Sequence, residues 1–148
     1  MADEREVRNL VARYADAIAS RDLDAWVATW AEQCEWSVLG TSRSGRAGVL
    51  ERLEELLGGL DFVVQIASGG IVELEGDRGR GRWTVTEHGR FASGDPLFTL
   101  GVYDDQYIRE DGRWCFSKRV FHAIYIGPPD MSAKATRPPA GFRDNRSG

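Results

Sequence analysis

The first 60 residues carry apolar side chains at the spacing of amphipathic helices. Leucine, valine and aromatic residues recur every three or four positions, which gives a helix one apolar face. This pattern predicts three helices, over residues 4–20, 23–30 and 45–60. Asp22 can cap the second helix, and Gly58-Gly59 ends the third. A short strand is expected over residues 34–39.

From residue 61 onward the apolar residues alternate with polar ones, which is typical of strands. The remaining strands are predicted over residues 62–75 with a break at Gly69-Gly70, and over residues 78–91, 99–109 and 113–126. Asp111-Gly112 predicts that the last two strands form a hairpin, because the turns that match strand twist need residues that tolerate positive φ.

Helices followed by strands, rather than alternating with them, indicate an α+β fold with a mostly antiparallel sheet. We expect a cone-shaped, curved antiparallel sheet wrapped around the long N-terminal helix, with two further helices, enclosing one pocket. One domain is predicted over residues 1–132, because 148 residues suffice for a single core. Residues 133–148 are expected to form an irregular tail.

The composition excludes several classes of partner. The net charge is −4 and no basic cluster is present, so a nucleic-acid partner is not expected. No apolar run approaches the roughly 20 residues that a membrane span needs. The N-terminus lacks the apolar region of a signal peptide. Cys34 and Cys115 are too few for a disulfide framework, so we expect free thiols and a cytoplasmic protein.

Glu87 is the strongest candidate for chemistry. Alternation along its strand places Trp83, Val85 and Glu87 on the apolar face, which should line the interior. A carboxylate there loses its hydration, its pKa rises, and it becomes a candidate general base. The alternative is a solvated Glu87 at the rim of the sheet. His88 should face away from the pocket.

The pattern does not decide which face of the last strand lines the interior, because both faces mix apolar and polar residues. His122 could lie near the mouth of the cavity, although an oligomer contact is favoured. Arg119 could bind a carboxylate of a ligand, although an ion pair with Asp104 or Asp105 is favoured. Because the sequence has only two histidines, a histidine-based metal site is not expected.

Four segments together resemble SnoaL-like members of the nuclear transport factor 2-like superfamily. They are YADAIASRDLD from Tyr14, the tripeptide Cys34-Glu35-Trp36, GVYDDQYIREDGRWCFSKR from Gly101, and IGPPDMS from Ile126. The resemblance implies a conical α+β fold, one pocket, and no metal or organic cofactor. It also implies acid–base chemistry on a small hydrophobic molecule, and homodimers or homotrimers that form through the sheet.

The resemblance also concerns individual residues. It implies that Tyr14, Trp36 and Tyr103 lie in the pocket, although plain core packing is the alternative for each. Relatives carry a catalytic Asp–His pair, and the corresponding places here hold Ala19 and Gln65. Alanine cannot orient an imidazole, and an amide cannot accept a proton at useful pH. The usual pair is therefore expected to be absent.

The function that we predict is a cofactor-independent lyase, isomerase or cyclase that acts on a small hydrophobic substrate. Glu87 would be the base and Tyr103 a hydrogen-bond donor. The further pocket residues that we predict are Tyr14, Trp36, Gln65, Trp83, Val85, Arg119 and His122. Two alternatives stay open: a protein that binds a hydrophobic ligand without transforming it, and a small subunit of an assembly like the ring-hydroxylating dioxygenases.

Overall fold

The computed structural model describes residues 2–142, and these residues form three helices and six strands. The helices are α1 (Ala2–Ser20), α2 (Leu23–Val27) and α3 (Gly45–Leu57). The strands are β1 (Trp30–Val38), β2 (Thr41–Ser44), β3 (Leu60–Glu75), β4 (Arg78–Phe91), β5 (Pro96–Glu110) and β6 (Arg113–Gly127). The α+β class, with a long N-terminal helix and a curved sheet, is confirmed.

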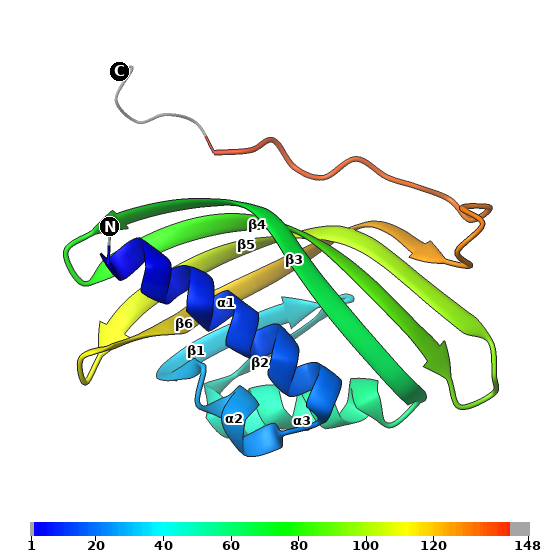
Figure 1. The fold of residues 1–148 in the computed structure, drawn as a ribbon, viewed down its shortest axis with the longest axis horizontal. Helices are drawn as coiled ribbons and strands as arrows, with labels where there is room; N and C mark the ends of the chain where they lie inside the picture. The colour runs from blue at the N-terminus through cyan, green and yellow to red at the C-terminus, as the bar shows by residue number, and fades with distance from the viewer. Residues whose placement is uncertain (1, 143–148) are drawn as a thin grey trace.

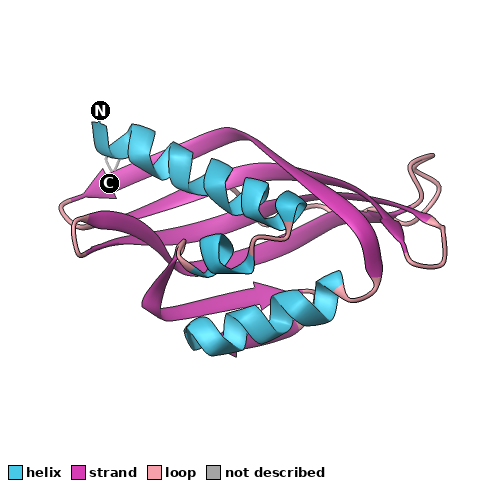
Figure 2. Cartoon of the chain, turned by 60° about the horizontal axis from the view of Figure 1, so that its bottom comes forward, coloured by secondary structure: helices cyan, strands magenta, loops and turns pink. Residues whose placement is uncertain are grey.

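The strands of the described chain form one curved sheet in the order β2-β1-β6-β5-β4-β3. α1 lies along one face of this sheet (Figure 1), and α3 lies beside β1 and β2 (Figure 2). All neighbouring strands are antiparallel except β1 and β6, which are parallel. The expected mostly antiparallel sheet is therefore confirmed, and the one parallel pair makes it a mixed sheet.

The local signals located most of the elements, and the errors have physical causes. The second helix ends at Val27, short of the predicted residue 30, because Trp30 already pairs with Phe116 as a strand. The strand β2 was not expected at all. The predicted break at Gly69-Gly70 is a bulge inside a continuous β3: Gly69 has a φ of +62°, and the pairing with β4 shifts there. Asp111 and Gly112 have φ of 52° and 76°, so the predicted hairpin turn is confirmed.

The core lies between α1 and the sheet. α1 buries one apolar face, formed by Val7, Leu10, Val11, Tyr14, Ala17 and Ile18. All five tryptophans are at most 6% exposed, and rings from Tyr14, Trp26, Trp30, Trp36 and Phe116 pack against one another at centroid distances of 5.4–6.1 Å. Within residues 2–142 both cysteines are free and buried, as predicted. No helix in this range is both long and apolar enough to cross a membrane.

Residues 128–142 continue beyond β6 without regular structure, apart from a bridge between Tyr125 and Ala135. The backbone amide of Thr136 donates to the carbonyl of Ile124 at 2.8 Å, so this segment first runs along the end of β6. Further on, the Arg82 side chain donates to the carbonyls of Pro139 and Ala140 at 2.7 and 2.8 Å.

Candidate functional site

A cavity of about 180 Å³ lies between α1, α3 and the inner face of the sheet. Its walls are mostly leucine, valine, isoleucine and phenylalanine side chains from both helices and from every strand except β2. A volume of about 150 Å³ is enough to hold a single aromatic ring, so this cavity suits a small apolar molecule. The polar groups in the walls belong to Tyr14, Trp36, Gln65, Glu87, Thr99 and Tyr103.

Glu87 and Gln65 form the acidic side of the cavity. They are direct partners in the β3–β4 pairing, so their side chains leave the sheet on the same face. The Gln65 amide donates to the Glu87 carboxylate at 3.3 Å. Burial raises the pKa of Glu87 above its ordinary value of 4.5, and the Gln65 hydrogen bond opposes this shift only in part. Of the cavity-lining residues in the described chain, Glu87 is the one carboxylate.

Tyr103 and Tyr14 supply hydroxyl groups to the same cavity. The Tyr103 oxygen accepts a hydrogen bond from the Trp36 indole at 3.1 Å. Burial raises the pKa of Tyr103 to about 12 and also raises the pKa of Tyr14. Both tyrosines are therefore neutral donors at neutral pH, and both are close enough to Glu87 for its charge to oppose their ionisation.

Two buried polar atoms of the cavity residues have no hydrogen-bond partner within residues 2–142: the Tyr14 hydroxyl oxygen and the Gln65 carbonyl oxygen Oε1. We call them the open polar atoms. Leaving a buried polar atom without a partner costs about 1–3 kcal/mol, so such atoms are rare in folded proteins. Both belong to residues that line the cavity.

Four of the predicted pocket residues lie outside the cavity wall, which corrects the expectation for each. Trp83 and Val85 share the inner face with Glu87 but belong to the packed core. Arg119 is fully buried behind the cavity and pairs with Asp105, as favoured. His122 follows Phe121, which lines the cavity, so strand alternation turns His122 outward, where it lies 3.1 Å from Asp104.

The two places aligned with the Asp–His pair differ in their surroundings. Gln65 lines the cavity, whereas Ala19 lies on the exposed face of α1. α1 contributes Tyr14 and Ile18 to the cavity wall, so it places no carboxylate there. Of the described residues that line the cavity, none is a histidine. The described residues that line the cavity therefore supply a carboxylate and two phenols, but no acid–imidazole pair.

The resemblance that places Tyr103 in the pocket also places there the row of residues on the same strand face, which includes Thr99. Thr99 pairs with Glu87 across β4 and β5, is 4% exposed and lines the cavity. No group of three or more histidine, cysteine, aspartate or glutamate residues suited to a metal ion occurs in the described structure.

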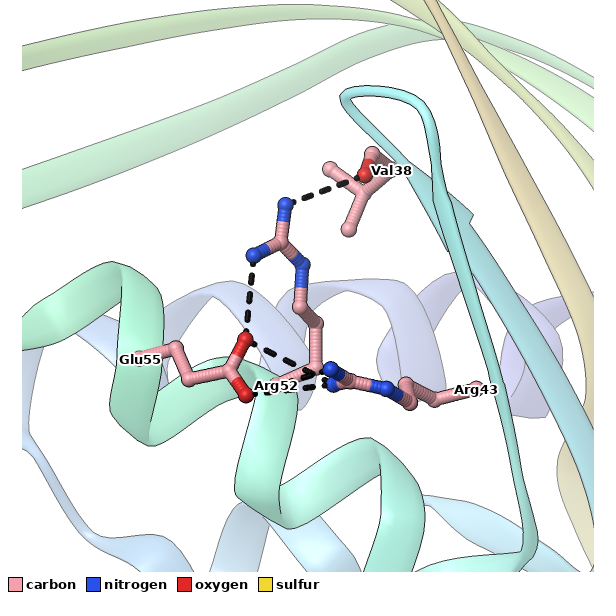
Figure 3. A network of polar contacts seen from close by, with 4 residues as sticks. All are labelled: Val38, Arg43, Arg52 and Glu55. Atoms are coloured by element: carbon pink, nitrogen blue, oxygen red, sulfur yellow. Dashed lines mark hydrogen bonds and ion pairs between the residues drawn. The ribbon is translucent and has the colours of Figure 1, made fainter.

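A group of polar side chains holds α3 against β1 and β2 at the side of the cavity (Figure 3). Arg52 of α3 donates to the carbonyl oxygen of Val38 at 3.3 Å and lies 3.1 Å from Glu55. Glu55 also pairs with Arg43 of β2 at 3.2 Å. Because Val38 and Leu53 line the cavity, these contacts fix one of its walls.

The chain belongs to the SnoaL-like domain family, which matches residues 1–120. Among solved structures, it is similar to a hexachlorocyclohexane dehydrochlorinase, LinA type 2, with a TM-score of 0.81 and 21% identity over 93% of this chain and 95% of that one. A scytalone dehydratase-like protein from Novosphingobium aromaticivorans gives a TM-score of 0.82 and 18% identity over 96% of both chains. At these identities the likeness shows the fold alone. None of the curated proteins matches the chain by sequence.

Proposed function

We propose that the chain is a cofactor-independent enzyme of the lyase, isomerase or cyclase type, which removes a proton from a small, neutral, hydrophobic substrate. Glu87 is the general base in this proposal. Tyr103 and Tyr14 donate hydrogen bonds to the substrate oxygen on which negative charge develops. Two neighbours whose structures are named for dehydrochlorinase and scytalone dehydratase-like proteins support a reaction of this general type.

The reaction needs a base and a donor in one apolar space. Glu87 takes a proton from a carbon next to a carbonyl or a leaving group, and the electron pair moves onto the carbonyl oxygen or expels the leaving group. The tyrosine hydroxyls stabilise that charge, and their hydrogen bonds are stronger in a site without bulk water. A carboxylate with a raised pKa is also a better base than an exposed one.

The observation that carries the proposal is the cavity itself. It brings an ionisable carboxylate with a raised pKa and two neutral phenol donors into one apolar hollow. Neither open polar atom has a structural role that the described chain reveals. A substrate with one acceptor oxygen would meet the Tyr14 hydroxyl and bring its acidic C–H group toward Glu87.

The experiment uses 5-nitrobenzisoxazole, whose ring opens when a base removes its C–H proton. The N–O bond then breaks and a coloured nitrophenolate forms. The rate at which its absorbance rises depends both on the base that removes the proton and on the donor that stabilises the phenolate oxygen. The wild-type protein should accelerate this reaction, and Glu87→Gln should reduce the acceleration by about 100-fold or more, because a general base contributes that much. Glu75→Gln, which changes an exposed carboxylate of β3, is the matched control.

Two results would contradict the proposal. Equal rates for wild-type and Glu87→Gln proteins would remove Glu87 from the mechanism. Saturable binding of the probe without any acceleration would favour a ligand-binding protein.

We also propose that the chain forms homodimers or homotrimers through the outer face of the sheet. Phe62, Val64 and Ile66 alternate along the edge strand β3 on that face and are 45%, 43% and 51% exposed. A row of exposed apolar side chains is typical of a subunit interface. Light scattering should find an oligomer for the wild type and a smaller species for Val64→Lys. A wild-type monomer would contradict the proposal.

A further inference from the structure

Arg119 lies in the core directly behind the two tyrosines of the cavity. Its side chain has no exposed surface. The guanidinium carbon is 3.9 Å from the centre of the Tyr103 ring and 4.4 Å from the centre of the Tyr14 ring. A third ring, that of Phe116, lies at 4.3 Å. The cation therefore contacts the ring faces of both donors while their hydroxyl groups serve the cavity.

A chain of hydrogen bonds fixes this guanidinium. Its Nε and Nη2 atoms donate to the two carboxylate oxygens of Asp105 at 2.7 and 3.2 Å. The Tyr107 hydroxyl donates to the same carboxylate at 3.0 Å, and the Trp83 indole donates to Tyr107 at 2.9 Å. One edge of the guanidinium thus faces Asp105, while aromatic rings surround its carbon. Its position relative to the tyrosines is set by the whole network.

Stability alone does not account for this ion pair. Removing two charges from water is costly, and an apolar pair of similar size is often as stable or more stable. A cation against the face of a phenol ring is attracted by its electrons and favours negative charge on the phenol oxygen. A phenol polarised in this way is a stronger hydrogen-bond donor. The pair is thus suited to a role in the cavity.

We infer that Arg119 is a positioning residue whose guanidinium, held by Asp105, strengthens Tyr14 and Tyr103 as hydrogen-bond donors to an anionic oxygen in the cavity. Arg119 acts through the tyrosines and does not touch the ligand. The inference rests on the proposed function only in its use of these two tyrosines as donors. It does not require that Glu87 acts as a base.

The test compares the binding of two ligands of similar size, 4-nitrophenolate and nitrobenzene. It is carried out at a pH above the pKa of unbound 4-nitrophenol, so that this ligand is an anion. Glu87→Gln serves as the parent protein, because the Glu87 charge would repel the anion. In this parent, Arg119→Met with Asp105→Leu removes both charges and leaves an apolar pair. Binding of 4-nitrophenolate should weaken about 30-fold, the scale of a desolvated cation–π contact, while binding of nitrobenzene stays unchanged.

Two further variants keep the test decisive. Arg119→Lys retains the charge and should keep most of the preference for the anion, even if the double replacement does not fold. Arg109→Met removes an arginine that also stacks on a ring, Trp114 at 5.0 Å, and pairs with Asp3, but lies away from the cavity. It should change neither affinity.

Three results would overturn the inference. Unchanged affinity for 4-nitrophenolate would show that the buried charge does not act on the donors. Equal weakening for both ligands would show a purely structural role. Failure of the parent to bind 4-nitrophenolate while it binds nitrobenzene would remove the tyrosines as donors. Because the assay lacks the Glu87 carboxylate, its outcome is separate from the rate comparison that tests the proposed function.

Discussion

The space between α1 and the sheet has two halves that are built from the same strands. Side chains pack one of them, the filled half, and the other, the cavity half, contains the cavity. On β4, Trp83 fills one half and Glu87 borders the cavity in the other, four residues along the strand. On β5, Tyr107 and Tyr103 repeat this division. In the filled half, Trp83 and Tyr107 are 6% and 1% exposed, and their indole and hydroxyl groups are joined by hydrogen bonds to the buried ion pair.

The cavity half keeps polar groups without completing their hydrogen bonds. The open polar atoms of Tyr14 and Gln65 lie here, and so does the Glu87 carboxylate with its raised pKa. The filled half thus holds the buried ion pair behind the tyrosines, whereas the cavity half is hollow and has the Glu87 carboxylate in its wall.

The largest expected effect is in the filled half. Asp105→Asn should lower the free energy of unfolding by about 3–5 kcal/mol, because it leaves the Arg119 charge buried without a full partner. Urea unfolding measures the change. Asp104→Asn, at a neighbouring carboxylate that is 30% exposed, should cost at most about 1 kcal/mol. Equal losses of stability from the two variants would show that burial does not make the Asp105–Arg119 pair more important than the exposed one.

A second change tests how tightly the filled half is packed. Gly81→Ala places a methyl carbon against the Tyr107 hydroxyl, which is held by hydrogen bonds to Trp83 and Asp105. It should cost about 1–3 kcal/mol by overpacking, measured by thermal unfolding. Gly59→Ala meets no atom within 4 Å and is the control. A neutral Gly81→Ala would mean that this half has room to relax.

Glu87→Gln should change stability in a pH-dependent way. Burial raises the pKa of Glu87 above 4.5, so a pH window lies between 4.5 and the pKa of the folded state. In this window the folded state keeps a proton that the unfolded state has lost. Wild-type stability should therefore fall across the window, and the variant should be the more stable protein at pH 7. The advantage should shrink as the pH approaches 4.5, which unfolding curves at several pH values can check. An advantage independent of pH would contradict the account.

The smallest expected effect comes from a pair of buried threonines. Thr29 donates to the carbonyl of Trp26 at 2.6 Å, whereas the described structure records no side-chain hydrogen bond for Thr99 in the cavity wall. Thr29→Val should cost about 1 kcal/mol, and Thr99→Val should be nearly neutral for stability. Urea unfolding of both variants gives the comparison. A larger cost at Thr99 would mean that the cavity wall is fully paired.

The sequence predicted what local patterns control. The hairpin at Asp111-Gly112 depends on two residues that tolerate positive φ, and the apolar face of α1 depends on spacing alone. The parallel pairing of β1 with β6 joins segments about 80 residues apart and has no local signal. Alternation gave the correct face for Trp83 and Glu87. It could not show where along the strand the packed core ends and the cavity begins, since that depends on side chains from α1 and α3.

The measurement that tests the central claim most directly is a carbon-13 NMR titration of the Glu87 carboxyl group, assigned by comparison with Glu87→Gln. The account predicts a titration midpoint above 4.5, because the carboxylate loses hydration inside an apolar cavity. A midpoint at or below 4.5 would show a solvated carboxylate and would contradict the account of a ligand cavity with a base in its wall.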